Sequence, residues 1–120
     1  MQNQVFDALV AGLTVHFGTG HPLDSGTGVR FQLSKRGKLT AYHTNIATGN
    51  QAEIAFEPGT VAKRLAMTER ELRSLIGELR TKTGRGVSPD PQFNWPRVGL
   101  ADTRDVELVL AAIENGLQSV

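Results

Sequence analysis

The spacing of apolar residues changes repeatedly along the chain, and the first segment has helical spacing. Its apolar residues recur at i, i+1, i+4, i+5 and i+8, which lines one face of a helix: Val5, Phe6, Leu9, Val10 and Leu13. A secretory signal peptide would need a basic start, an uninterrupted apolar stretch and a cleavage site. Asp7 and His16 interrupt this stretch, and no such site follows. The first 17 residues therefore predict an amphipathic helix.

The period falls to two after a glycine-rich loop at residues 18–28. Apolar and polar residues alternate over 29–34, 39–44 and 52–57, which is typical of half-buried strands. A turn at residues 35–38 separates the first two strands. Short strands with tight turns predict an antiparallel meander with one apolar face and one solvated face.

Helical spacing returns after Pro58 and Gly59, which end the predicted sheet. Residues 61–67 have the pattern of a short helical turn. Thr68 and Glu71 have the spacing of a capping box, in which each side chain bonds the other's backbone N–H. The helix that follows, ending near residue 83, has one apolar face made of Leu72, Leu75, Ile76 and Leu79.

The last part of the chain begins with a polar, proline-rich segment, residues 84–94, which we interpret as a long loop. Residues 95–100 predict a short strand, and Pro96 places its start at a sheet edge. Asp102 is a good N-cap for a final helix, and Gly116 a good C-cap. The expected buried stripe of this helix is Val106, Val109, Leu110 and Ile113.

The order helix, three strands, helix, strand, helix predicts an α+β fold. We expect a three-stranded antiparallel meander plus a fourth short strand, with the helices packed on one face. Residues 1–120 contain no repeat and no linker, so they predict a single globular domain.

Composition excludes several classes of protein. The chain has 120 residues, 39% of them hydrophobic, and no cysteine. Cysteine-based zinc sites, iron–sulfur clusters, disulfides and thiol nucleophiles are therefore excluded. The apolar content is too high for intrinsic disorder, and no apolar run is long enough to span a membrane. Without an export signal or cysteine, we expect a cytoplasmic protein that does not contact membranes.

The net charge of +1 conceals an uneven distribution along the chain. Residues 61–100 hold eight basic and four acidic groups, whereas residues 101–120 hold one basic and four acidic groups. No acidic residue lies between Asp24 and Glu53, a gap of 28 residues. The basic residues in that gap are Arg30, Lys35, Arg36 and Lys38. Near-neutrality thus excludes a uniformly basic nucleic-acid binder but leaves a basic patch possible.

Two basic segments are candidates for contact with phosphates. One is the predicted hairpin tip at residues 35–38, and the other is the loop that contains Arg85 and leads to Arg97. Trp95, the single tryptophan, lies beside that loop and could stack on a base or anchor a protein partner. The alternatives are a solvated turn at the tip and a tryptophan that folds back to close the core.

Other chemistries receive less support. His16, His21, Asp24 and His43 could be drawn together as a metal or small-ligand site, but their spacing fits no compact ligand geometry. His43 also falls on the apolar register of its strand, as a core histidine would. The glycine pairs near residues 18–28 complete no dinucleotide motif. Glu53 and Glu57 share one strand face about 13 Å apart, at about 3.3 Å per residue, too far for a paired-carboxylate site.

The stretch from Trp95-Pro96-Arg97-Val98-Gly99-Leu100-Ala101-Asp102 through Ile113 is similar to the end of small bacterial domains of the YjbR-like kind. Those domains pair a last strand with an Asp-capped helix after an antiparallel sheet. The resemblance covers about a fifth of the chain. It implies an α+β fold and a role in binding DNA or protein partners, without an assigned reaction.

The leading hypothesis is a small non-enzymatic domain, without a cofactor, that contacts nucleic acid or a nucleic-acid-handling protein. Its contacts would be Arg30, Lys35, Arg36, Lys38, Arg85, Trp95 and Arg97. One alternative is a protein–protein adaptor or inhibitor, of the phage or defence-system type, that uses the same loop. A second alternative is a metal-binding or small-ligand enzyme built on the three histidines and Asp24.

Overall fold

The structure is a computed structural model that describes residues 3–33, 38–44, 46–47, 49–83 and 95–118. The described residues form an α+β fold with helices and strands in the order α1-β1-β2-β3-β4-α2-α3-β5-α4. Their bounds are α1 Gln4–Phe17, β1 His21–Pro22, β2 Gly28–Gln32, β3 Lys38–Tyr42, β4 Ala52–Phe56, α2 Pro58–Arg64, α3 Glu69–Thr83, β5 Arg97–Leu100 and α4 Thr103–Gln118. The predicted α+β class is therefore confirmed. No helix in these ranges is both long enough and apolar enough to cross a membrane.

Over the described part of the chain the sheet has five strands in the order β1-β2-β3-β4-β5, and all neighbours are antiparallel. The predicted meander and the fourth strand at a sheet edge are present, but the predicted number of strands is too low. The additional strand, β1, lies in the segment that we expected to be a loop, where His21 pairs with Arg30 and Pro22 with Val29. A strand of two residues has no periodic pattern, so only the pairing reveals it.

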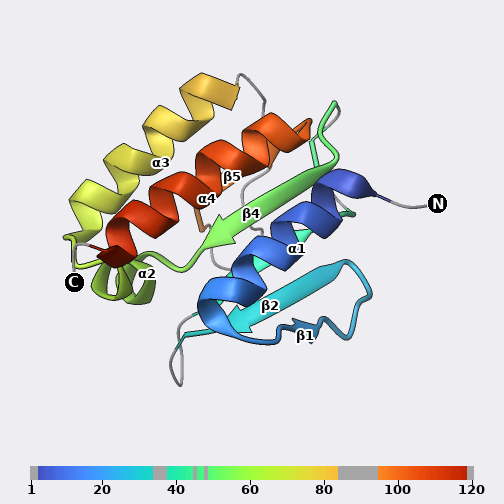
Figure 1. Ribbon diagram of the computed structural model, residues 1–120, viewed down its shortest axis with the longest axis horizontal. Coiled ribbons are helices and arrows are strands. Elements are labelled where there is room, and N and C mark those ends of the chain that lie inside the picture. Colours follow the sequence, from blue (N-terminus) through green and yellow to red (C-terminus); the bar gives the residue numbers. More distant parts are fainter. Residues whose placement is uncertain (1–2, 34–37, 45, 48, 84–94, 119–120) are drawn as a thin grey trace.

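Helices α1, α4 and α3 lie side by side over one face of the sheet, with α4 in the middle (Figure 1). Helix α1 begins where the side chain of Asn3 accepts a 3.0 Å hydrogen bond from the Phe6 N–H, which satisfies one of the unpaired donors at a helix start. Its apolar face buries Val5, Leu9 and Leu13. These side chains and those of the strands form one apolar cluster between the helices and the sheet. The helices therefore pack on one face, as expected.

Helix α2 begins earlier than predicted, because Pro58 opens the helix as well as ending the sheet. Proline is favoured in the first turn, where a backbone N–H has no partner to lose. The carboxylate of Glu57 caps this turn by accepting hydrogen bonds from the Gly59 N–H at 3.2 Å and the Thr60 N–H at 2.8 Å. The chain thus passes from β4 into a helix without a loop.

The junction between α2 and α3 contains a left-handed residue and a capping box. Ala66 has a φ of +57°, and the N–H groups of Ala66 and Met67 bond back to Lys63 and Ala62, as in a Schellman turn. The capping box is confirmed, because Thr68 N–H donates to the Glu71 carboxylate at 2.9 Å and Glu71 N–H donates to the Thr68 hydroxyl at 3.1 Å. The two motifs end one helix and start the next within a few residues.

The last helix starts as predicted but does not end at Gly116. The Asp102 carboxylate accepts a 3.0 Å hydrogen bond from the Asp105 N–H, and the Asp105 carboxylate accepts one of 2.9 Å from the Ala101 N–H. Gly116, which we expected to be the C-cap, is a buried residue inside α4. A Cβ at Gly116 would lie 3.0 Å from the Leu65 Cβ, so this glycine allows the close packing of α4 against the end of α2.

Candidate functional site: the outer face of the sheet

The outer face of the sheet, which we define as the face turned away from the helices, is polar. Phe31, Leu39 and Ile54 belong to the apolar cluster on the helix side, and side chains alternate along a strand. The residues directly before and after each of these on its strand therefore point to the outer face. The strand register aligns one row across this face, namely His21, Arg30, Thr40, Ala55 and Arg97. A second row contains Gly28, Tyr42, Glu53 and Gly99, and Gln32 pairs with Lys38 beside the first.

A buried ion pair connects β4 and β5 on the outer face. The guanidinium Nη1 of Arg97 lies 3.1 Å from Oε1 of Glu53, and the exposed fractions of the two side chains are 5% and 0%. The guanidinium also lies over the ring of Tyr42, 4.3 Å from its centroid, which is a cation–π contact. Glu53, Arg97 and Tyr42 therefore form a connected cluster across three strands.

The other oxygen of Glu53 bonds the segment that precedes β4. Its Oε2 accepts a 2.7 Å hydrogen bond from the Ala47 N–H and a 3.4 Å one from the Asn50 side-chain amide. Gly99 makes room for this arrangement, because a Cβ there would collide with the Asn50 amide. Glu53 thus holds both the approach to β4 and the neighbouring strand β5.

The β1–β2–β3 half of the outer face is more accessible than the β4–β5 half. Arg30 and Lys38 are half-buried, while Gln32 and His21 are exposed. Arg30 and Lys38 occupy diagonal positions on adjacent strands, which are typically about 7–8 Å apart. Neither forms an ion pair within the described ranges, and the buried Nε of Arg30 has no hydrogen-bond partner. Because Glu53 offsets Arg97, the positive charge of this face comes from Arg30 and Lys38.

The residues predicted from sequence are not all brought together. Arg30 and Lys38 share the accessible half of the outer face, whereas Lys35, Arg36 and Arg85 lie outside the described residues. Trp95 is half-buried just before β5. The Arg97 guanidinium is held by Glu53, so a contact with phosphate would require that ion pair to open.

Sequence reasoning missed Tyr42 and the pairing of Glu53 with Arg97. Tyr42 and Glu53 both stand on the polar register of their predicted strands, which is a signal that they share a face. Nothing in the sequence indicates that this face is buried at Glu53, because the partner, Arg97, is 44 residues away along the chain.

The histidine-based site does not have the geometry of a metal centre. Within the described ranges, which include all four of its residues, no three His, Asp or Glu side chains are arranged to hold a metal ion. The expectation of a buried His43 was wrong, because β3 ends at Tyr42 and the imidazole is exposed beyond it. Its ring packs edge-on against Phe6 of α1, with centroids 4.7 Å apart, so the predicted register was nevertheless correct.

Comparisons of the chain with protein-family models, curated proteins and solved structures found no match. The resemblance of residues 95–113 to YjbR-like domains therefore stays a prediction.

Proposed function

We propose that this chain is a small non-enzymatic α+β domain that binds nucleic acid through the accessible half of its outer face. The observation that carries the proposal is the shared face of Arg30 and Lys38, at diagonal positions and without acidic partners in the described part of the chain. Lys35 and Arg36 lie between β2 and β3 in the sequence and carry two further positive charges. Basic side chains grouped in this way bind phosphates by displacing condensed counterions.

The shape of the surface favours a single-stranded ligand. Duplex readers insert a helix or a two-stranded ribbon into a groove, whereas single strands lie across sheet faces and basic grooves. Here the helices cover the opposite face, so the sheet itself offers the basic surface (Figure 1). Arg85 and Trp95 are further candidate contacts. Arg97 would act by positioning Tyr42 and Glu53 beside the basic residues, rather than by contacting phosphate.

The experiment measures fluorescence anisotropy with labelled single-stranded DNA and RNA at several salt concentrations. Replacing Arg30 and Lys38 together by glutamine should weaken binding to both. The slope of log affinity against log salt should become less steep by about 1.4, because each contact with a single strand contributes about 0.7. Both residues are only half-buried and have no ion-pair partner among the described residues, so the fold should persist, which circular dichroism can check.

The matched control replaces Arg70 and Arg80 by glutamine. Both are exposed on α3, and the change in net charge is the same. The proposal is wrong if this control weakens binding as much as the double variant does. It is also wrong if the unaltered protein binds neither oligonucleotide at low salt.

A further inference from the structure

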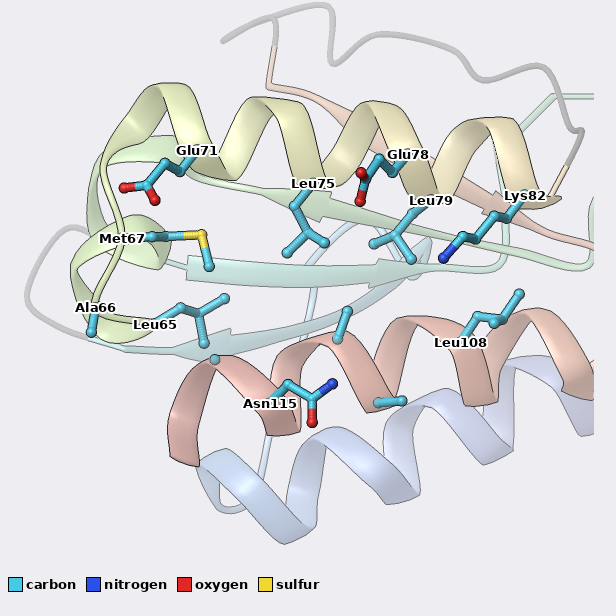
Figure 2. Close-up of a pocket in the computed structure, with 13 residues that line it drawn as sticks. Leu65, Ala66, Met67, Glu71, Leu75, Glu78, Leu79, Lys82, Leu108 and Asn115 are labelled. Carbon is cyan, nitrogen blue, oxygen red and sulfur yellow. The ribbon is translucent and has the colours of Figure 1, made fainter. Parts of the chain in front are cut away.

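A groove of about 500 Å³ runs between α3 and α4, away from the outer face of the sheet (Figure 2). Its α3 wall includes Glu71, Leu75 and Glu78, and its α4 wall includes Leu108, Ala111 and Ala112. Glu71, Leu75 and Glu78 are spaced by four and three residues, and Ala111 and Ala112 lie three and four residues after Leu108, so each set lies on a single helix face. The groove is therefore a continuous surface between two packed helices.

The groove exists because the side chains on the α4 wall are too small to fill the space beside α3. Ala111 and Ala112 face the leucines of α3, and alanine reaches only one carbon from the backbone. Leu65 and Gly116 also line the groove, where the absence of a side chain on Gly116 lets α4 approach Leu65 closely. Along the rest of the groove, Leu75 and Leu108 remain only partly buried.

The charge of the groove is acidic and lies on one wall. Glu71 and Glu78 of α3 are both exposed there, and the α4 wall carries no charged residue, while Lys82 stands at the far end. The hydrogen bond from the Thr68 N–H holds the pKa of Glu71 below its ordinary value of 4.5. Two carboxylates thus stand above an apolar floor of leucine and alanine.

We propose that this groove binds an amphipathic helix of a partner protein, with apolar residues on the groove floor and basic residues against Glu71 and Glu78. The α3 wall from Glu71 to Lys82 covers 12 residues and rises by about 16 Å, which fits about three turns of a helix. Opposite charge along one flank would fix the direction and register of the bound helix.

A second copy of this chain is a poorer occupant. Among the described residues, the single large apolar side chain that is strongly exposed is Val15, at 81%. A helix that fills the groove needs an exposed apolar ridge at i, i+4 and i+7, and no described helix of the chain offers one. The inference does not depend on nucleic-acid binding, since the groove and the outer face share no described residue.

The test uses two labelled synthetic helical peptides that have the same leucine ridge, one flanked by lysines and one by glutamates. Fluorescence anisotropy should show binding of the lysine peptide, with the glutamate peptide at least about tenfold weaker. Ala111→Arg should weaken binding of the lysine peptide about tenfold or more, because the arginine side chain fills the groove. Ala11→Arg, at an equally exposed helical alanine of α1, should leave it unchanged.

A charge reversal tests the acidic wall without filling the groove. Glu78→Lys should weaken binding of the lysine peptide severalfold and strengthen binding of the glutamate peptide. Asp24→Lys, an equal charge change in the β1–β2 loop, should change neither affinity. Equal binding of the two peptides, or equal effects of Ala111→Arg and Ala11→Arg, would overturn the proposal. The proposal would also be overturned if sedimentation showed that the unaltered protein is a dimer and that Ala111→Arg dissociates it. The occupant of the groove would then be a second copy.

Discussion

The two faces of β4 are buried equally but by different chemistry. Glu53 and Ile54 are neighbours in sequence, and each has an exposed fraction of 0%. Ile54 lies in the apolar cluster beneath the helices, while Glu53 lies on the outer face in an ion pair with Arg97. The degree of burial alone therefore does not distinguish the apolar core of this protein from its candidate functional face. The difference lies in what each side chain requires of its neighbours.

The apolar face requires only matching volume, whereas the outer face requires a particular partner. Burial of a side chain such as Ile54 stabilises the fold by about 1.5–3 kcal/mol, with little dependence on direction. A buried ion pair contributes little net stability, because desolvation offsets its attraction, but loss of one member leaves an uncompensated charge. We expect the Glu53–Arg97 pair to specify how β4 meets β5 and how the outer face is shaped.

The largest effect should come from removing the charge of Glu53. Glu53→Gln keeps the shape but removes the negative charge that lies 3.1 Å from the buried Arg97 guanidinium, which should cost about 3–5 kcal/mol of unfolding free energy. Urea denaturation followed by circular dichroism measures this loss. Replacing Glu53 and Arg97 together by methionine should restore only part of the stability, because the Ala47 N–H and the Asn50 amide still lose their acceptor. A loss below about 1 kcal/mol for Glu53→Gln would show that the outer face tolerates substitution as an apolar face does.

The matched substitution on the other face is Ile54→Ala. It should cost about 2–5 kcal/mol, from lost apolar burial and the cavity left beside the helices. The same denaturation experiment should give a loss that does not change with salt concentration, since no charge is involved. A strong salt dependence would contradict the contrast between the two faces.

A smaller effect is expected at the start of α3, on the helical side. Thr68→Ala should cost about 1 kcal/mol, because the Glu71 N–H loses the hydroxyl that caps it. The pKa of Glu71 is below 4.5, first because the Thr68 N–H donates to its carboxylate and second because of the Thr68 side chain. The pKa of Glu71 measured by NMR titration in the Thr68→Ala variant should therefore rise only part of the way to 4.5. A full return to 4.5 would show that the backbone bond is lost as well.

The sign of the pH dependence follows from the lowered pKa of Glu71. Its contribution to stability is present above the ordinary pKa of 4.5 and is lost as the pH falls through the pKa of the folded state. Glu71→Gln should remove this part of the acid sensitivity, and the unaltered protein should lose more stability on acidification than the variant does.

The smallest effect should be a gain of stability at Ala66. Its left-handed conformation costs an L-residue about 1–2 kcal/mol, and glycine avoids this cost while losing about 0.5–1 kcal/mol more entropy on folding. Ala66→Gly should therefore stabilise the protein by about 0.5–1 kcal/mol in thermal denaturation. A loss of stability would show that the methyl group, which lines the groove, contributes more by packing than the backbone costs.

The parts of the fold that sequence predicted are those with local signals. The capping box of Thr68 and Glu71 and the cap at Asp102 depend on groups three residues apart, and both are present. Period-two spacing likewise predicted β2, β3 and β4 within a residue or two. Such features are decided by neighbours along the chain, which a sequence displays directly.

The parts that sequence did not predict depend on contacts between distant segments. In the sequence, Gly116 has the position of a helix C-cap. In the structure it packs against Leu65, about fifty residues earlier, inside the helix. The pairing of Glu53 with Arg97 depends on which strand lies beside β4. For the candidate site, the strand period was enough to place Arg30 and Lys38 on one face, but not to show that Arg97 is held by an acid.

The proline in β1 limits how the sheet can associate with other chains at that edge. The N–H and C=O of one residue in an antiparallel ladder point to the same side. The Leu23 N–H donates to the Gly28 carbonyl of β2, so the neighbouring Pro22 faces the free edge of β1. Proline has no N–H, so it cannot donate to an added strand there, and β1 is only two residues long. Growth of the sheet from chain to chain, as in strand-swapped oligomers or fibrils, is therefore disfavoured at the β1 edge.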